Sequence, residues 1–468
     1  MKIQVETGSK AFAGGGFLAF RQADRLLAGR ITRLIDEKCP NLGVPNSKRV
    51  ELIVGQTIHG HKSTNAAWRD AKQTNAAAFV NRKLSKQDGR NIHRAIEAVG
   101  KAGGERLYEE IAVGALEKTG VSIAVAHEDS TSLFFTGKKA ARAKKGYSRD
   151  HRPDKLQVNV GIMHVKGTRF PSAYVVTPGN EHDSQIFVKL VEKAKSGTLV
   201  VADRGAVSKE NKALVMNKGR HYLFGEKLYD PVKREALEAL PKMKRVNKGY
   251  FAYSVKEGEE WRHYFLSKKL RSDVRKKRKR NAKETAAEYA KNLEKKRRSS
   301  VKRLTRITAE GEEVVVEREV VTKRLFCKTR KQILAELSKN DPLDGVFVLS
   351  SDKISNPLEA LREYKGKDEV EKVFCALKSS LHLRPFHARK KECVDGVVFI
   401  TMLALLVVSL LAFCSHATGV AVKTLVEELR RVTLLVSKAV RNGFRKAACL
   451  NLEGLARKLL GNVTLLAR

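Results

Sequence analysis

Cysteine is scarce in this chain of 468 residues, and none of its six cysteines form a C-x-x-C pair. Several lie inside apolar runs, where a free thiol behaves as a small hydrophobic side chain. We therefore expect free thiols in a reducing, intracellular compartment. We also expect no secretion signal, because three glycines interrupt the apolar stretch near the N-terminus, Ala11–Phe20, and Glu6 precedes it.

Acidic residues are few relative to basic ones. The chain carries 92 Lys and Arg against 51 Asp and Glu, which leaves a formal net charge of +41, while 42% of its residues are hydrophobic. This length and composition predict a globular chain of roughly two to four domains. So large a positive charge predicts a polyanionic partner bound through its phosphates, and an anionic membrane surface is the weaker alternative.

Long uncharged runs are absent except for Val397–Ser415, which is close to the length that spans a membrane. Such a segment forms either a membrane helix or the central helix of a large core. It occurs once, and basic residues on both sides give no inside bias. We therefore favour the buried core helix and expect no membrane association.

Residues 1–118 predict a helical N-terminal region that binds DNA. Apolar residues recur at helical spacing from about residue 17 onward. The residues that carry this periodicity are Leu26, Ile31, Leu34, Ile35, Ile92, Ile96, Ile111 and Leu116. A helix-turn-helix reader and a plain helical scaffold both fit this pattern.

Residues 119–226 change to the period of strands and predict an α/β core with a mixed sheet. Two further helices, Ser184–Ala194 and Lys209–Asn217, interrupt the strands. The predicted strands are Val121–His127, Leu156–Val165, Phe170–Thr177, Thr198–Ala202 and His221–Gly225.

Residues 227–345 break this rhythm and predict an insertion domain that contains strands, at Tyr250–Val255, Arg262–Ser267 and Glu313–Phe326. Its run Arg271–Arg303 holds fifteen basic and four acidic residues. A solvated helix or loop and a DNA contact are equally compatible with such a run.

The core is expected to resume over residues 346–418, beginning with a strand at Gly345–Leu349. Residues 419–468 predict a helical C-terminal region. Its apolar stripe, suited to packing or self-association, consists of Leu425, Leu429, Val432 and Leu435.

Two aspartates follow predicted core strands. Asp129 lies at the end of the first strand, within Ala126–Ser132, and Asp203 lies at the end of a later strand, within Val200–Gly205. Either alone is more typical of a turn or cap residue. Together, two carboxylates from separate strand ends of one α/β core are what a magnesium site requires.

A helix through Glu371 supplies a third carboxylate. On an ideal helix Tyr364, Lys367, Glu371 and Lys378 lie within about 60° of one another. Gly366 could mark the start of this helix, which would leave Tyr364 just outside it. The adjoining arc, which would seat the helix on the sheet, consists of Val370, Phe374, Leu377 and Leu381. An amphipathic surface helix with ion pairs fits this geometry as well.

The spacing of Tyr364, Lys367, Glu371 and Lys378 resembles the Y-(2)-R-(3)-E-(6)-K signature of insertion-sequence transposases of family four, with lysine in place of the arginine. Coverage runs from about residue 121 to 412. Four further segments are similar to stretches of that family in the same order: Gly146–Asp154, Gly179–Asp183, Ala202–Gly205 and Leu383–Phe386.

This resemblance implies a ribonuclease H-like core with Asp129, Asp203 and Glu371 as catalytic carboxylates and metal ligands. It also implies that Tyr364, Lys367 and Lys378 contact DNA, and we add Arg204, which follows the second aspartate. Two departures are present: Lys367 lacks the bidentate grip of arginine, and Val397 stands where relatives often have histidine.

The chemistry expected of such a site is in-line displacement at a phosphodiester, first by water and then by a 3′-hydroxyl. Two Mg²⁺ ions, with Mn²⁺ as the alternative, would activate the nucleophile and neutralise charge on the phosphate. The expected partners are terminal inverted repeats and target DNA, with a homodimer joining two ends in a bacterial cytoplasm, near the nucleoid. A nuclease without strand transfer and a non-catalytic DNA-binding derivative are the competing interpretations.

Overall fold

A computed structural model describes residues 10–461 except 62, 138, 169, 297–300, 308–312, 320–329, 382–387 and 442–443. The chain forms two compact units. The first comprises Met1–Gly225, Ser351–Ile354 and Glu359–Arg468, and the second comprises Glu226–Ser350 and Ser355–Leu358. The segment Leu383–Phe386, which carries part of the family resemblance, lies outside the described residues.

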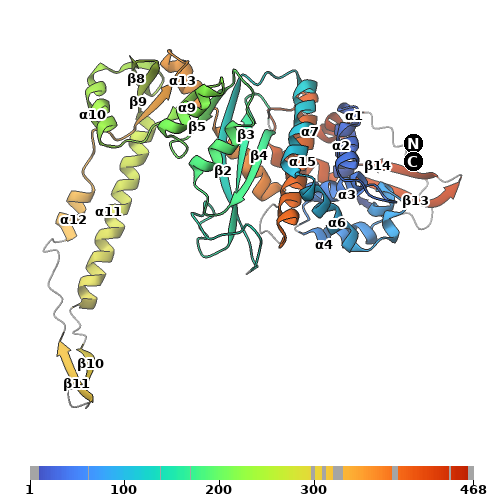
Figure 1. Cartoon of the computed structure of the whole chain (residues 1–468), viewed down its shortest axis with the longest axis horizontal. Coiled ribbons are helices and arrows are strands. Elements are labelled where there is room, and N and C mark those ends of the chain that lie inside the picture. Colours follow the sequence, from blue (N-terminus) through green and yellow to red (C-terminus); the bar gives the residue numbers. More distant parts are fainter. Residues whose placement is uncertain are drawn as a thin grey trace. The chain divides into compact units, whose positions relative to one another are not determined.

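The first unit opens with the helices that the apolar periodicity predicted (Figure 1). Ile31, Ile35, Ile92 and Ile96 are all buried, as their spacing requires. A short strand, β1 (Lys10–Ala13), precedes the helices. They are α1 (Gly15–Leu26), α2 (Arg30–Lys38), α3 (Asn46–His59), α4 (Thr64–Gln73), α5 (Ala76–Val80), α6 (Gly89–Lys101) and α7 (Gly104–Thr119), with a 3₁₀ turn η1 (Leu84–Lys86).

Five strands of the first unit lie in the order β4-β3-β2-β5-β6. The pairs β2·β3 and β3·β4 are antiparallel, whereas β2·β5 and β5·β6 are parallel. The sheet is therefore mixed, and the predicted α/β class is confirmed. The strands are β2 (Val125–Phe134), β3 (Gln157–Val165), β4 (Pro171–Pro178), β5 (Leu199–Ala202) and β6 (His221–Gly225).

Helices cover both faces of this sheet. On one face α8 (Asp183–Val191) and α9 (Lys209–Asn217) pack against the strands, and their core includes Ile186 and Val215. On the other face α7 and α14 (Asp368–Cys375) contact the sheet within a core that also holds the N-terminal helices. Because β3 is covered on both faces, all nine of its residues are buried.

The uncharged run forms most of α15 (Lys391–Cys414), which contacts α1, α3, α6 and α7 (Figure 1). It is the one described helix whose length and composition would let it cross a membrane, and most of its apolar stretch is buried inside the protein. Leu405 at its centre has no exposed surface. The prediction of a buried core helix is therefore confirmed.

The C-terminal region is not simply helical, and that prediction is wrong. After α16 (Val422–Arg431) the chain forms an antiparallel pair, β13 (Thr433–Arg441) and β14 (Phe444–Leu450), before α17 (Gly454–Leu460). Leu425 and Leu429 share the buried face of α16, but Leu435 belongs to β13. An Asn-Gly pair at 442–443 stands between the strands in sequence, and such a pair favours a hairpin over a helix.

The second unit has its own strands in the order β12-β9-β8-β7 and a separate antiparallel pair, β10·β11. The predicted strands around Tyr250 and Arg262 are confirmed, and the strand predicted at Gly345–Leu349 is present as β12, most of which belongs to this unit. The strands are β7 (Lys244–Asn247), β8 (Tyr250–Glu257), β9 (Glu260–Ser267), β10 (Val301–Ile307), β11 (Glu313–Glu319) and β12 (Val346–Ser351).

Most of the basic run of the second unit forms a long helix, α11 (Lys268–Lys296), and its last residues enter β10. Arg271, Arg275 and Arg278 all bond to the backbone or carboxylate of Asp344, which is almost fully buried. Part of the charge therefore holds this unit together. Its other helices are α10 (Asp230–Ala239) and α12 (Arg330–Leu337), with a 3₁₀ turn η2 (Leu240–Lys242).

The single helix expected through Glu371 is divided into three segments. α13 (Pro357–Lys365) ends before Gly366, α14 begins at Asp368, and a π-helical turn, η3 (Ala376–Ser380), follows it. The ideal-helix stripe is therefore broken at both ends. The apolar arc is nevertheless buried as predicted, at Val370, Phe374, Leu377 and Leu381.

Candidate active site

Asp129 lies in the middle of β2 and not at its end, so the position predicted from sequence is wrong. The strand runs on to Phe134 because β3 continues to pair with it on the antiparallel side, where Asp129 faces Ile162. On the other side β5 ends at Ala202. The carboxylate therefore lies where the parallel half of the sheet stops.

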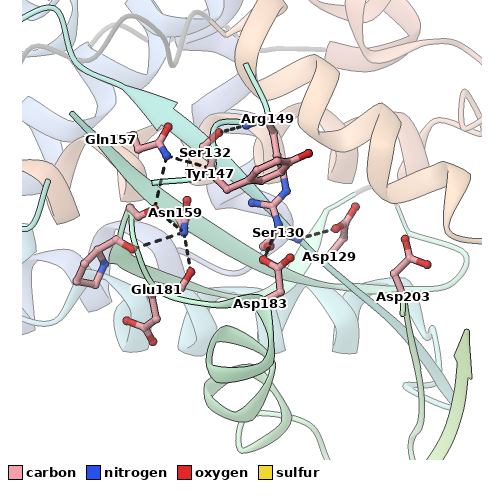
Figure 2. A network of polar contacts seen from close by, with 12 residues as sticks. Asp129, Ser130, Ser132, Tyr147, Arg149, Gln157, Asn159, Glu181, Asp183 and Asp203 are labelled. Atoms are coloured by element: carbon pink, nitrogen blue, oxygen red, sulfur yellow. Dashed lines mark hydrogen bonds and ion pairs between the residues drawn. The ribbon is translucent and has the colours of Figure 1, made fainter. Parts of the chain in front are cut away.

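Asp203 follows β5 directly and therefore also lies where the parallel half of the sheet stops. The parallel register ends with His127 beside Val201, so Asp129 and Asp203 each lie two residues beyond the last pair, and the charge of Asp203 acts on Asp129. Side chains alternate along a strand, so Asp129 shares a face with Leu133, which lies in the core that includes Val370 of α14. The Asp129 carboxylate therefore points to the face that α14 covers. Figure 2 shows Asp129 and Asp203 among the neighbouring polar side chains.

Tyr364 and Lys367 meet Asp203 from the junction between α13 and α14. The Tyr364 hydroxyl donates to Asp203 Oδ1 at 2.7 Å, and Lys367 Nζ lies 3.1 Å from Oδ2. The Lys367 ammonium also lies 5.8 Å from the centre of the Tyr364 ring. The lysine side chain is only 13% exposed, whereas that of Asp203 is 53% exposed. Asp203 is therefore held from one side and open to solvent on the other.

The electrostatics of the two aspartates differ. Burial raises the pKa of Asp129, and the nearby Asp203 adds to this rise against the opposing charges of Lys367 and Arg149. Burial also tends to raise the pKa of Asp203, but the Lys367 charge and the Tyr364 hydrogen bond outweigh it and lower that pKa below its ordinary value. Two adjacent carboxylates thus attract positive charge, which Lys367 partly supplies.

Arg204 follows Asp203 directly, and Glu371 lies on α14, which begins directly after Lys367. Glu371 is exposed on α14. Arg204 is exposed after β5, and its backbone N–H donates to Asp203 Oδ1 at 3.1 Å. Among the residues that the structure describes, no three His, Cys, Asp or Glu side chains are close enough to hold a metal ion.

Lys378 is separated from the other signature residues. Its Nζ lies 2.7 Å from Asp150 Oδ1, and the two side chains are 11% and 5% exposed. Asp150 belongs to the loop between β2 and β3. Lys378 lies in the π-helical turn η3, about three turns beyond Lys367, and its ammonium is used inside the protein.

A polar network that the sequence reasoning did not assign supports this region (Figure 2). The Arg149 guanidinium bonds to Ser130 Oγ and to the Asp183 carboxylate, and Ser130 Oγ also donates to Asp183. The backbone N–H of Ser130 in turn donates to Asp129 Oδ1 at 2.8 Å. The sequence signal was present, since Arg149 and Asp183 lie in two of the segments similar to the transposase family.

Residues 124–407 match the family model described as the transposase DDE domain, which is more than half of the chain. The chain belongs to the transposase DDE domain family. The matched region contains Asp129, Asp203 and Glu371 together with the residues around them. Membership supports a role in DNA transposition, and the family normally uses divalent metal ions.

A solved structure of the piggyBac transposase synaptic complex with hairpin DNA is similar with a TM-score of 0.43 and 8% sequence identity, covering 91% of this chain and 82% of that one. No curated protein matches the chain.

The donor set at the site fits a divalent cation. Asp129 and Asp203 offer hard carboxylate oxygens, which Mg²⁺ prefers, and they are near enough for the charge of Asp203 to act on Asp129. Lys367 already places one positive charge against Asp203. The half-exposed Asp203 leaves room for a ligand from solvent.

Proposed function

We propose that this chain is a DDE transposase that cleaves DNA at the ends of an insertion sequence of family four and joins them to a target. The observation that carries the proposal is the Asp129–Asp203 pair on one face of the sheet, approached by Lys367 and Tyr364. Three antiparallel strands followed by two parallel ones, with helices on both faces, support a ribonuclease H-like core.

In this proposal Asp129, Asp203 and Glu371 hold the metal ions. Bound Mg²⁺ or Mn²⁺ would activate a hydroxyl nucleophile and neutralise charge at phosphorus. Asp129 is fixed by β3 on one side, while the Tyr364 hydroxyl orients Asp203. Glu371 comes from the helix that begins directly after Lys367.

The cationic residues would then hold the DNA strand. Lys367 faces the carboxylates and is placed to balance them when a phosphate approaches, and exposed Arg204 adds a second positive charge beside Asp203. Lys378 contributes indirectly, since it holds Asp150 and with it the loop between β2 and β3. This assignment replaces the DNA contact that the family signature implied for Lys378.

The proposed partners are the terminal inverted repeats and target DNA, bound by a homodimer in a bacterial cytoplasm near the nucleoid. The net charge of +41 supports binding through phosphates. Affinity for duplex DNA should therefore fall steeply as salt increases. Binding that hardly changed with salt would contradict a phosphate-dominated interface.

Mapping the products decides the chemistry. The full chain is incubated with its own flanking DNA and Mg²⁺, with EDTA as the control, and the cut positions are read on a sequencing gel. Cuts at the element ends, followed by joining of pre-cleaved ends to a second DNA, are expected. Cleavage without joining would instead identify a related nuclease, and no metal-dependent nicking would identify a non-catalytic binding protein.

A further inference from the structure

His127 is a fully buried polar side chain next to the site, and it is not one of the proposed ligands. It lies in β2 two residues before Asp129, so alternation along the strand places both side chains on the face that α14 covers. Burial of an imidazole costs free energy unless its nitrogen atoms form hydrogen bonds. The partner of His127 therefore indicates what the ring does in this position.

That partner lies in α13, one residue before Tyr364. His127 Nε2 lies 2.9 Å from the backbone carbonyl oxygen of Glu363. A carbonyl oxygen only accepts hydrogen bonds, so Nε2 carries the proton and donates it. The next residue is Tyr364, whose hydroxyl donates to Asp203 Oδ1 at 2.7 Å. The imidazole thus holds the backbone from which the hydroxyl that orients Asp203 extends.

Gly366 packs directly on the same ring. A Cβ at this position would lie 2.7 Å from His127 Nε2 and 2.8 Å from Cε1, which is too close for any side chain. The residue that follows is Lys367, whose ammonium lies 3.1 Å from Asp203 Oδ2. His127 therefore contacts the backbone beside both residues that hold Asp203.

An ion pair from the same two strands fixes Glu363 as well. Lys166 Nζ lies 2.8 and 2.7 Å from the two carboxylate oxygens of Glu363, whose side chain is only 5% exposed. Lys166 directly follows β3, and its backbone N–H donates to the carbonyl of Val125, the first residue of β2. The junction between α13 and α14 is thus attached to the strand that carries Asp129.

We propose that His127 is a positioning residue for the metal site. It holds the backbone of the junction so that the Tyr364 hydroxyl stays on Asp203, and in this way it sets the affinity of the Asp129–Asp203 pair for a divalent cation. It contacts neither the ion nor the DNA. This role rests on the proposed function and deepens it, because it names a residue that acts on the ligands through another residue.

The test measures Mn²⁺ binding to the full chain without DNA, from the electron paramagnetic resonance signal of the free ion. His127→Leu keeps a buried side chain but lacks the N–H, and it should bind Mn²⁺ about ten-fold more weakly, as is usual when a residue that orients a ligand is lost. His127→Gln can place an amide N–H near the position of Nε2, so it should bind the ion nearly as wild type does. Unchanged affinity in His127→Leu would overturn the proposal.

A double variant tests whether His127 acts through Tyr364. Tyr364→Phe should itself weaken Mn²⁺ binding, because the hydroxyl that orients Asp203 is gone. Adding His127→Leu to Tyr364→Phe should then cause little further loss. Losses that multiply in the double variant would show that the two residues act independently, which is contrary to the proposal.

His164→Leu is the matched control. His164 pairs with His127 across β2 and β3 and is equally buried, but its Nε2 lies 2.8 Å from the Thr168 carbonyl oxygen, in the turn after β3. His164→Leu should therefore lower the unfolding temperature without changing the affinity for Mn²⁺. Equal weakening of Mn²⁺ binding in His127→Leu and His164→Leu would show a general packing defect and would overturn the positioning role.

Gly366→Ala decides the question if His127→Leu does not fold. Its methyl group should push the junction away from the ring while the imidazole remains, so Mn²⁺ binding should again be weaker, and wild-type affinity would count against the proposal. Failure of the proposed function is recognised separately with Asp129→Asn and Asp203→Asn, which should lose Mn²⁺ binding. If both bound the ion as wild type does, the metal site would be wrong and the positioning role with it. If both lost the ion while His127→Leu kept full affinity, only the positioning role would fail.

Discussion

Two Asp–Lys ion pairs lie at opposite ends of α14, and they differ in burial. Lys367 at the start of the helix meets Asp203, whose side chain is half exposed, whereas Lys378 in the turn after the helix meets Asp150 where both groups are nearly inaccessible. An exposed pair can exchange its cation for another, while a buried pair must stay closed to avoid leaving a charge without compensation. Two lysines of one sequence signature therefore have different roles.

The largest effect is expected from the three proposed metal ligands. Asp129→Asn, Asp203→Asn and Glu371→Gln should each reduce metal-dependent cleavage by about a thousand-fold or more, because they keep side-chain volume but remove the charge that holds a hard cation. Cleavage rates and DNA affinity are measured in parallel, and affinity should change little.

Asp368→Asn is the matched control, since Asp368 is an exposed carboxylate in the first turn of the same helix. It should cleave at a rate close to wild type. Equal loss of cleavage in Asp368→Asn and Glu371→Gln would show that the helix as a whole, and not one ligand, limits activity.

The next largest effect is a loss of folding stability when the buried Lys378–Asp150 pair is broken. Lys378→Gln should lower the free energy of unfolding by about 3–5 kcal/mol, because it leaves the Asp150 carboxylate buried without its lysine. Denaturant melts of Lys378→Gln, Asp150→Asn and the double variant test this, and the double variant should recover part of the loss. Additive losses in the double variant would mean that the two groups act independently.

A smaller change in folding stability is expected when the Lys367–Asp203 pair is broken. Lys367→Gln should alter the free energy of unfolding by about 1 kcal/mol or less, because solvent screens Asp203. It should nevertheless weaken binding to DNA and lower the cleavage rate. The comparison with Lys378→Gln is direct: the lysine paired with buried Asp150 should affect mainly melting, and the lysine paired with half-exposed Asp203 should affect mainly activity. A reversal of these effects would contradict the division of roles.

The smallest effect is expected from restoring the family residue. Lys367→Arg keeps the charge near Asp203 and adds a planar fork for phosphate, so it should bind DNA about three-fold more tightly with unchanged melting. Affinity titrations at one fixed salt concentration measure the difference. Weaker binding by the arginine variant would show that the site around Tyr364 is built for lysine.

The strands of the core could be predicted because their side-chain pattern is local. All five predicted strands of the first unit are present, and β6 has the predicted bounds. The position of Asp129 could not be read this way, because β2 continues past the point where β5 ends, and strand pairing joins segments far apart in sequence. The two aspartates were found, but not the register that brings them together.

The prediction that the four signature residues share one face of a single helix is wrong for a different physical reason. Ideal periodicity assumes an unbroken helix, whereas Gly366 interrupts the backbone and η3 changes the turn. Lys367 still contacts Asp203, whereas Lys378 contacts Asp150 in the loop between β2 and β3. Buried Gln157 also holds this loop in place. The Asn-Gly pair at 442–443 favours a hairpin, but the helical spacing of the apolar residues led to the prediction of a helix there.

The position of α15 has a consequence for how the chain acquires its structure during synthesis. This helix lies late in the sequence, yet α1, α3, α6 and α7 all pack against it. The N-terminal helices therefore leave the ribosome well before the surface that covers their apolar sides exists. Contacts so distant in sequence slow folding and leave apolar surface exposed meanwhile. Nascent chains that end before Lys391 should need a chaperone to stay soluble, and completion of α15 should release them.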